Sequence, residues 1–174
     1  MTLTLMCGLS FSGKSTLAGR LAQALPATVI SLDAINEERG LDGGQGIPVE
    51  EWATTNRIAH ERAGALLEEG RHVVVDDTGS PRFLRDEWRA TADRVGAPFA
   101  LVWVQIGHDL QQERVRANRE SRSRPDVTDA VLEAHRAGFE APTDENAITV
   151  DARTTADPRQ VEEIVRRLSA SGAR

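Results

Sequence analysis

The sequence predicts an α/β fold in which helices cover both faces of a parallel β-sheet. Short apolar runs of strand length alternate along the chain with longer amphipathic stretches. The 174 residues include 40% hydrophobic and 28% charged side chains, a composition typical of one globular domain with its own core. No internal repeat, low-complexity tract or linker divides the sequence, so we expect a single domain over residues 1–174.

Five apolar runs have the length of buried parallel strands. They cover Leu3 to Cys7, Thr28 to Ser31, His72 to Val75, Phe99 to Ile106, and Ala147 to Val150. The segments between and after these runs are predicted to be helical. The predicted helices are Lys14 to Leu25, a short helix near Asp33, Val49 to Glu69, Pro81 to Val95, Asp109 to Arg119, Thr128 to Phe139, and Pro158 to Leu168. The glycine-rich stretch Gly40 to Pro48 is predicted to be a loop.

The first strand leads into a phosphate-binding pattern. The segment Gly8 to Ser15 matches G-x-x-x-x-G-K-[ST], the Walker A motif, and a predicted helix starts at its lysine. In this context the loop amides and the helix N-terminus form an anion site. We expect Lys14 to reach the β- and γ-phosphates of ATP and Ser15 to ligate Mg²⁺. The expected nucleotide contacts are Gly8, Ser10, Ser12, Gly13, Lys14, Ser15 and Thr16.

Lys14 is the only lysine in the sequence. A GC-rich genome would explain why the other long cationic side chains are arginines. The planar guanidinium group cannot replace a compact ammonium in a tight phosphate site. The position of the single lysine therefore supports the assignment of this loop.

The third strand ends in two acids, Asp76 and Asp77, followed by Thr78. A carboxylate at the end of a strand beside a P-loop holds Mg²⁺ directly or through water. Two turn acids after a strand are the structural alternative. Adjacent strand residues point in opposite directions, so the sequence leaves open which acid faces the metal.

Asp33 follows the second strand, at the edge of the sheet where ligands of such folds bind. A carboxylate there could accept the proton of an acceptor hydroxyl during phosphoryl transfer. Capping of the following helix is the alternative role.

Five arginines lie between the fourth strand and Pro125, namely Arg114, Arg116, Arg119, Arg122 and Arg124. An arginine over the γ-phosphate would neutralise charge in the transition state, whereas a solvated helix face with ordinary ion pairs is the alternative. We expect at least one catalytic arginine. The candidates are Arg119 and Arg122, which are three residues apart, and Arg119 is also expected to contact the nucleotide. A lid is expected over approximately residues 119–127.

In this order, the motifs resemble those of the small P-loop kinases that include polynucleotide 5′-hydroxyl kinases, chloramphenicol phosphotransferase and zeta-toxin-like kinases. The resemblance covers about Leu3 to Val150. It implies a three-layer P-loop NTPase sandwich with a five-stranded parallel sheet in the order 2-3-1-4-5. It also implies that Asp33 is the general base and that the lid arginine is Arg119 or Arg122.

Two further segments resemble motifs of these kinases. The family's Asp-Thr-Asn after strand three resembles Asp77-Thr78-Gly79, with glycine in place of asparagine. The stretch Phe139-Glu140-Ala141-Pro142 resembles a Phe-Glu-x-Pro stretch frequent in family members, and the sequence assigns it no role.

The motifs favour a kinase that transfers the γ-phosphate of Mg-ATP to a hydroxyl of a small molecule, such as a metabolite or an antibiotic. We expect the acceptor to lie under the loop Gly40 to Pro48 and to contact Asp33, Trp52, Arg57 and Thr78. Asn56 and His60 continue the helical spacing of Trp52, which a buried core would equally explain.

Two other functions stay open. A polynucleotide or nucleoside 5′-hydroxyl kinase could use Arg82, Arg85 and Arg89 on a phosphate backbone, although the net charge of −6 and the 4% aromatic content disfavour nucleic acid. A non-catalytic ATP-dependent switch would need no base at Asp33.

The sequence also predicts a cytoplasmic protein. Cys7 is the only cysteine, so no internal disulfide can form. The N-terminus lacks the pattern of a signal peptide, and no apolar run has the length of a membrane span. Nothing in the sequence indicates the oligomeric state.

Overall fold

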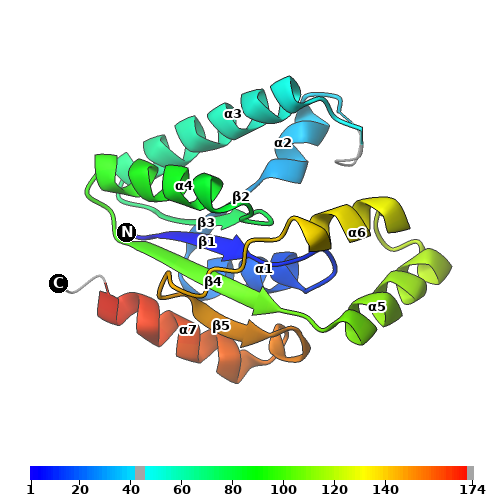
Figure 1. Cartoon of the computed structure of the whole chain (residues 1–174). Helices are drawn as coiled ribbons and strands as arrows, with labels where there is room; N and C mark the ends of the chain where they lie inside the picture. The colour runs from blue at the N-terminus through cyan, green and yellow to red at the C-terminus, as the bar shows by residue number, and fades with distance from the viewer. Residues whose placement is uncertain (42–45, 172–174) are drawn as a thin grey trace.

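The computed structural model is built around a five-stranded parallel sheet in the order β2-β3-β1-β4-β5, as predicted (Figure 1). It describes residues 1–41 and 46–171. The strands are β1 (Leu3–Cys7), β2 (Ala27–Ser31), β3 (His72–Asp76), β4 (Phe99–Gln105) and β5 (Ile148–Asp151). The described helices are α1 (Lys14–Ala24), α2 (Leu32–Glu38), α3 (Val49–Glu68), α4 (Arg82–Arg94), α5 (His108–Ser121), α6 (Asp129–Ala137) and α7 (Pro158–Ser171), with a short 3₁₀ turn at Ala152–Thr154.

The helices form a layer on each side of the sheet, which completes the predicted three-layer sandwich. Helices α1 and α7 pack together on one side, and α3 and α4 pack on the other, with α2 against α3 (Figure 1). Helices α5 and α6 lie beyond the ends toward which the strands run (Figure 1). The loops that follow β1, β2 and β3 therefore open toward α5 and α6.

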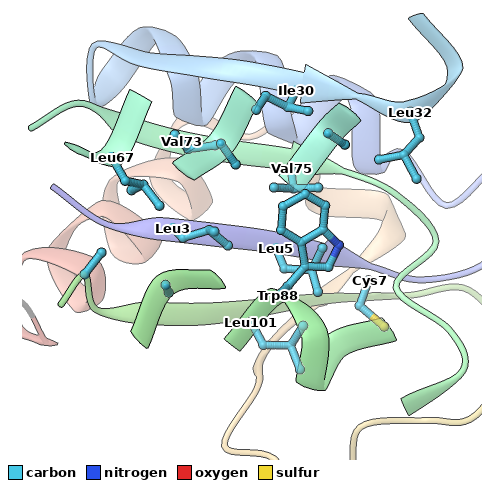
Figure 2. Close-up of a cluster of buried hydrophobic side chains, with 14 of the residues drawn as sticks. Leu3, Leu5, Cys7, Ile30, Leu32, Leu67, Val73, Val75, Trp88 and Leu101 are labelled. Carbon is cyan, nitrogen blue, oxygen red and sulfur yellow. The ribbon is translucent and has the colours of Figure 1, made fainter. Parts of the chain in front are cut away.

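Alternating side chains of β1 supply two separate cores. Leu3 and Leu5 are fully buried with Trp88 of α4 in one core (Figure 2). Met6 is buried with Leu17 of α1 in the other. Both faces of β1 are therefore apolar, as expected for a central strand of a covered parallel sheet.

Several element boundaries differ from those predicted. Strand β3 extends one residue further, to Asp76, because Asp76 still pairs in parallel register with Ser31 of β2. Pro81 is the N-cap of α4 and does not lie within its first turn. Helix α5 starts earlier and ends later than predicted, at His108 and Ser121.

The stretch after α6 anchors the loop after β3. The Arg85 side chain donates hydrogen bonds to the carbonyl oxygens of Gly79, at 2.7 Å, and of Glu140, at 2.9 Å. The Glu140 carboxylate accepts a 2.8 Å hydrogen bond from the backbone N–H of Arg82 at the start of α4. Arg85 is only 1% exposed and forms a 2.5 Å ion pair with Glu145, which is 3% exposed. The Phe-Glu-x-Pro stretch therefore holds α4 and the β3 loop in place.

We predict that Glu145 makes stability sensitive to acid. Hydrogen bonding to Arg85 lowers the pKa of Glu145 from 4.5 to about 2. The ion pair therefore contributes fully above pH 4.5, and its contribution is lost as the pH falls toward 2. We expect the stability difference between the parent protein and Glu145→Gln, measured by urea unfolding, to shrink by about 1.4 kcal/mol between pH 7 and pH 3.5.

The matched control for this experiment is Glu61→Gln, which removes an exposed ion pair with Arg57. Exposed pairs contribute little, so this variant should differ from the parent by less than about 1 kcal/mol at both pH values. A Glu145→Gln difference that is the same at pH 7 and pH 3.5 would contradict the assigned role of the pair.

Candidate functional site

A cleft with a volume of about 790 Å³ opens at the end of the sheet toward which the strands run. The P-loop and the start of α1 form one end of it, and α3 and α4 form the other. The loop after β3 lies between these ends, and residues of the 122–128 segment and of α6 also line the cleft. Its volume is in the range of small-molecule sites in proteins.

Glycines are required where the loops around the cleft approach other backbone and side chains. Gly13, the N-cap of α1, has φ 95°, and a Cβ atom there would lie 2.6 Å from Oγ1 of Thr155. Gly79 has φ 60°, and its Cβ would lie 2.9 Å from the carbonyl oxygen of Met6. A side chain would be strained at both positions. The lack of space therefore explains why glycine stands at both positions.

Side chains of α5 hold the outer side of the P-loop. Gln111 donates a 2.8 Å hydrogen bond to the carbonyl oxygen of Ser10. Arg114 donates to the carbonyl oxygens of Phe11, at 2.9 Å, and of Ser12, at 3.0 Å. Its second terminal nitrogen donates a 2.7 Å hydrogen bond to Ala152, after β5. Arg114, one of the five candidate arginines, thus binds loop carbonyl groups from outside the cleft.

Lys14 is buried at the base of the cleft. Its Nζ donates a 3.0 Å hydrogen bond to the carbonyl oxygen of Leu9. Burial lowers the pKa of Lys14, while the nearby carboxylates of Asp76 and Asp77 oppose this shift. The ammonium group is therefore close to both acids and only weakly solvated, as a phosphate-binding cation should be.

The structure gives the two acids after β3 different partners. Burial raises the pKa of Asp76, and a hydrogen bond with Ser15 opposes that shift. Asp77 accepts a 2.6 Å hydrogen bond from the backbone N–H of Thr78, and its other oxygen, Oδ2, is buried without a hydrogen-bond partner. Asp76 is therefore the acid next to the P-loop hydroxyl, whereas Asp77 stabilises its own turn.

The hydroxyl of Ser15 and the carboxylate of Asp76 are oxygen ligands of the kind that Mg²⁺ prefers. Within residues 1–41 and 46–171, no three His, Cys, Asp or Glu side chains are grouped so that they could hold a metal ion. A site with one or two protein oxygens fits a Mg²⁺ ion that is held mainly by substrate phosphates and water.

Asp33 lies in the first turn of α2 and lines the cleft. The helix is capped instead by Ser31, whose hydroxyl accepts a 3.3 Å hydrogen bond from the backbone N–H of Ala34. The negative charge of Asp33 contributes to the raised pKa of Asp76. The two carboxylates therefore face the same space from the ends of neighbouring strands.

The lid arginines are arranged differently from the prediction. Arg119 pairs with Asp126 at 3.1 Å and with Asp129 at 2.8 Å, and neither Arg119 nor Arg122 is among the described residues that line the cleft. Arg124 does line it. Its guanidinium group lies 4.5 Å from the centre of the Phe11 ring and influences the pKa values of both Lys14 and Asp76.

The placement of the other predicted site residues varies. Most of them line the cleft: Ser10, Gly13, Lys14, Ser15, Thr16, Asp33, Trp52, Arg57, Asp76, Asp77 and Thr78. Gly8 and Ser12 lie outside the lining, and the Ser12 side chain is fully buried. Residues 42–45 of the predicted acceptor loop lie outside the described residues.

Sequence reasoning missed Phe11, Phe83, Glu87, Val131 and His135 as lining residues. One available signal was the spacing of four residues between Val131 and His135, which places both on one side of α6. His60 also lines the cleft, but its ring stacks on Trp88, with ring centres 3.7 Å apart, and burial lowers its pKa to about 4.

A profile described as an AAA domain matches residues 3–142. No curated protein matches significantly.

In the described part of the chain, no helix combines the length and the apolar character needed to cross a membrane.

Three solved structures illustrate the fold. Kti12 from Chaetomium thermophilum in complex with ADP-AlF3 has a TM-score of 0.78 and 16% identity, covering 99% of this chain and 100% of that chain. APS kinase CysC from Mycobacterium tuberculosis in complex with AMPPNP and APS has a TM-score of 0.70 and 20% identity, covering 97% of each chain. A gluconokinase from Sinorhizobium meliloti 1021 has a TM-score of 0.63 and 23% identity, covering 99% of this chain and 91% of that chain. At these identities the likeness establishes the fold.

We predict that Lys14→Ala abolishes nucleotide-dependent activity but leaves the fold intact. The Lys14 ammonium group bonds to the carbonyl oxygen of Leu9 and lies close to Asp76 and Asp77 at the cleft, apart from the two apolar cores, so we expect the overall fold to persist without it. Turnover should fall by about 10²-fold or more, because the phosphate charge loses its main cation. Circular dichroism would measure the fold, and the reaction rate over a titration with ATP would measure turnover. The control is Arg20→Ala, which removes an exposed cation from the same helix and should change neither.

Proposed function

This chain belongs to the AAA domain family, and we propose that it is an ATP-dependent kinase that phosphorylates a hydroxyl group of a small molecule. The observation that carries the proposal is the position of Asp33. Its carboxylate lines the same cleft as the P-loop lysine and leaves the capping of α2 to Ser31. A side chain free of a structural task and facing the phosphate site is suited to proton transfer.

Phosphoryl transfer in this cleft would proceed by in-line displacement. Asp33 accepts the proton of the acceptor hydroxyl as its oxygen forms a bond to the γ-phosphorus of ATP. The bond between the γ-phosphorus and the bridging oxygen breaks, so the products are ADP and a phosphate monoester. Lys14 and the loop amides bind the phosphates throughout the reaction.

Mg²⁺ bound to ATP would offset phosphate charge and orient the γ-phosphate. Ser15 and Asp76 are the residues that we assign to holding it, because they adjoin each other at the start of α1. We assign Asp77 to the turn after β3 and not to the metal, because its Oδ1 is bonded to the Thr78 backbone N–H.

Nucleic acid is a poorer candidate for the acceptor. Of the three arginines that could bind a phosphate backbone, Arg85 is buried and Arg89 pairs with Asp86 and Glu145. Arg82 remains, and it lies 3.7 Å from Asp86. A reducing cytoplasm suits the single buried thiol of Cys7, and we propose that location for the protein.

The decisive experiment tests Asp33→Asn with Mg-ATP and a panel of small alcohols, nucleosides and a 5′-hydroxyl oligonucleotide, with products detected by mass spectrometry. We expect turnover to fall by about 10²–10⁴-fold while ATP affinity stays within a few-fold of the parent, because the base acts only on the acceptor. Asp109→Asn is the control, since Asp109 is also an exposed acid in the first turn of a helix.

Three outcomes would contradict the proposal in different ways. Loss of ATP binding in Asp33→Asn would remove Asp33 as the base. Full activity in this variant would point to another base. Tight ATP binding without any phosphorylated product from the parent protein would favour a nucleotide-dependent switch.

We further predict that Arg124 contributes more to turnover than Arg119. Arg124 faces Lys14 and Asp76, where transition-state charge develops, whereas Arg119 is paired with two acids outside the cleft. Arg124→Ala should lower kcat by about 10³-fold, and Arg119→Ala by less than about 10-fold. Steady-state kinetics on the phosphorylated acceptor would measure the ratio, and the reverse order would restore Arg119 as the catalytic arginine.

A further inference from the structure

The cleft has an apolar lining to which three helices and the segment before α6 contribute. Its apolar residues include Val49, Trp52, Phe83, Leu84, Val127 and Val131. Val49 and Trp52 belong to α3, Phe83 and Leu84 to α4, and Val131 to α6. Convergence of apolar side chains from separate elements is typical of a small-molecule site and not of one amphipathic helix.

Two of these residues are exposed to an unusual degree. Val49 is 80% exposed and Phe83 is 59% exposed, although both are large apolar side chains. Among the described residues, only Met1 and Val29 also belong to this exposed class. Water contact with apolar surface costs roughly 25 cal/mol per Å². The concentration of exposed apolar surface at one cleft mouth therefore indicates a partner that covers it.

The charges that α2, α3 and α4 contribute to the lining disfavour an anionic partner. Asp33 and Glu87 are negative. Arg57 is the one arginine or lysine that α3 and α4 contribute to the described lining, and it is 61% exposed and paired with Glu61 at 2.9 Å. A carboxylate or phosphate placed here would lose water without gaining a dedicated cation.

The histidines of the lining add no positive charge that could bind an anionic partner. Burial lowers the pKa of His60 to about 4, and burial together with the positive charge of Lys14 lowers the pKa of His135. Both imidazoles are therefore neutral at pH 7. Lys14 and Arg124 lie at the phosphate end of the cleft, where the proposed function requires them.

From the apolar lining, the exposed side chains of Val49 and Phe83, and the charges around them, we infer that the acceptor is an apolar alcohol, aromatic or cycloaliphatic, without negative charge. This inference rests on the proposed kinase function and names the substrate class of the same site. The apolar body of the alcohol covers Trp52 and Phe83, and its hydroxyl reaches Asp33. Sugar acids, phosphorylated sugars and nucleic-acid ends are excluded by the same lining.

The test compares five probes as acceptors with Mg-ATP: 3-phenyl-1-propanol, cyclohexylmethanol, glycerol, gluconate and a dinucleotide with a free 5′-hydroxyl. Mass spectrometry gives kcat/KM for phosphorylation, and calorimetry with AMPPNP present gives binding without turnover. We expect the two apolar alcohols to have kcat/KM values at least 10-fold above those of the other three. They should also bind in calorimetry, whereas gluconate and the dinucleotide should not.

A substitution of Phe83 separates binding of the acceptor from transfer of the phosphate. Phe83→Ser should raise KM for 3-phenyl-1-propanol by about 5- to 10-fold and leave kcat within 2-fold, because Phe83 contacts the body of the acceptor and not the transferred phosphate. Val29→Ser is the control, since Val29 is an exposed apolar residue on β2 outside the cleft, and it should change neither constant.

The outcomes distinguish this inference from the proposed function. Phosphorylation of gluconate or the dinucleotide with the highest kcat/KM, lost in Asp33→Asn, would overturn the inference and support the kinase function. Binding of the apolar alcohols without transfer of phosphate to any probe would support the apolar site and contradict the kinase function. Absence of binding by both apolar alcohols at 10 mM, or an unchanged KM in Phe83→Ser, would overturn the inference.

Discussion

The arrangement of the cleft depends on the hydrogen bonds that fix the P-loop from outside. A loop whose amides face a phosphate must turn carbonyl groups elsewhere, and buried carbonyl groups need donors. Gln111 and Arg114 of α5 supply these donors to three successive carbonyls, at Ser10, Phe11 and Ser12. Arg114 also bonds to Ala152, which follows β5. The loop is thereby attached both to α5 and to the edge of the sheet.

A second set of contacts ties the loop after β3 to the chain segment that follows α6. Arg85 donates to the carbonyl oxygens of Gly79 and Glu140 from Nη1, and Glu145 accepts hydrogen bonds from its Nε and Nη2. Removing one partner of such a buried pair leaves an uncompensated charge, which is strongly destabilising. The loop after β3 is therefore held through Arg85 by Glu145, which lies 60 positions after Arg85 in the sequence.

Local sequence patterns were sufficient to predict the fold and the P-loop residues that line the cleft. The P-loop pattern and the alternation of strands and helices both act over short distances, and the strand order followed from the family resemblance. The arginine that lines the cleft could not be chosen in this way. Helix α5 ends at Ser121, and Arg122 adopts a left-handed conformation with φ 52°, which turns the chain. Arg124 reaches Phe11 only because of this turn, which helical spacing from Arg119 does not predict. Likewise, different roles could be proposed for Asp76 and Asp77 only once their hydrogen-bond partners were known.

The acceptor end was the least predictable part, because its lining comes from elements distant in the sequence. In the sequence, Phe83 is one apolar residue near the start of a predicted helix. Only the structure shows that it lines a cleft together with residues of α3 and α6. The same convergence brings chemically different groups to one cleft. Lys14 and Arg124 line the cleft close to each other, and α3 and α4 contribute apolar side chains to the same lining. Asp33 lines the cleft together with both groups. Under the proposed function, its carboxylate accepts a proton from a weakly solvated alcohol while the cations attract the phosphate, and this division of charge links acceptor choice to catalysis.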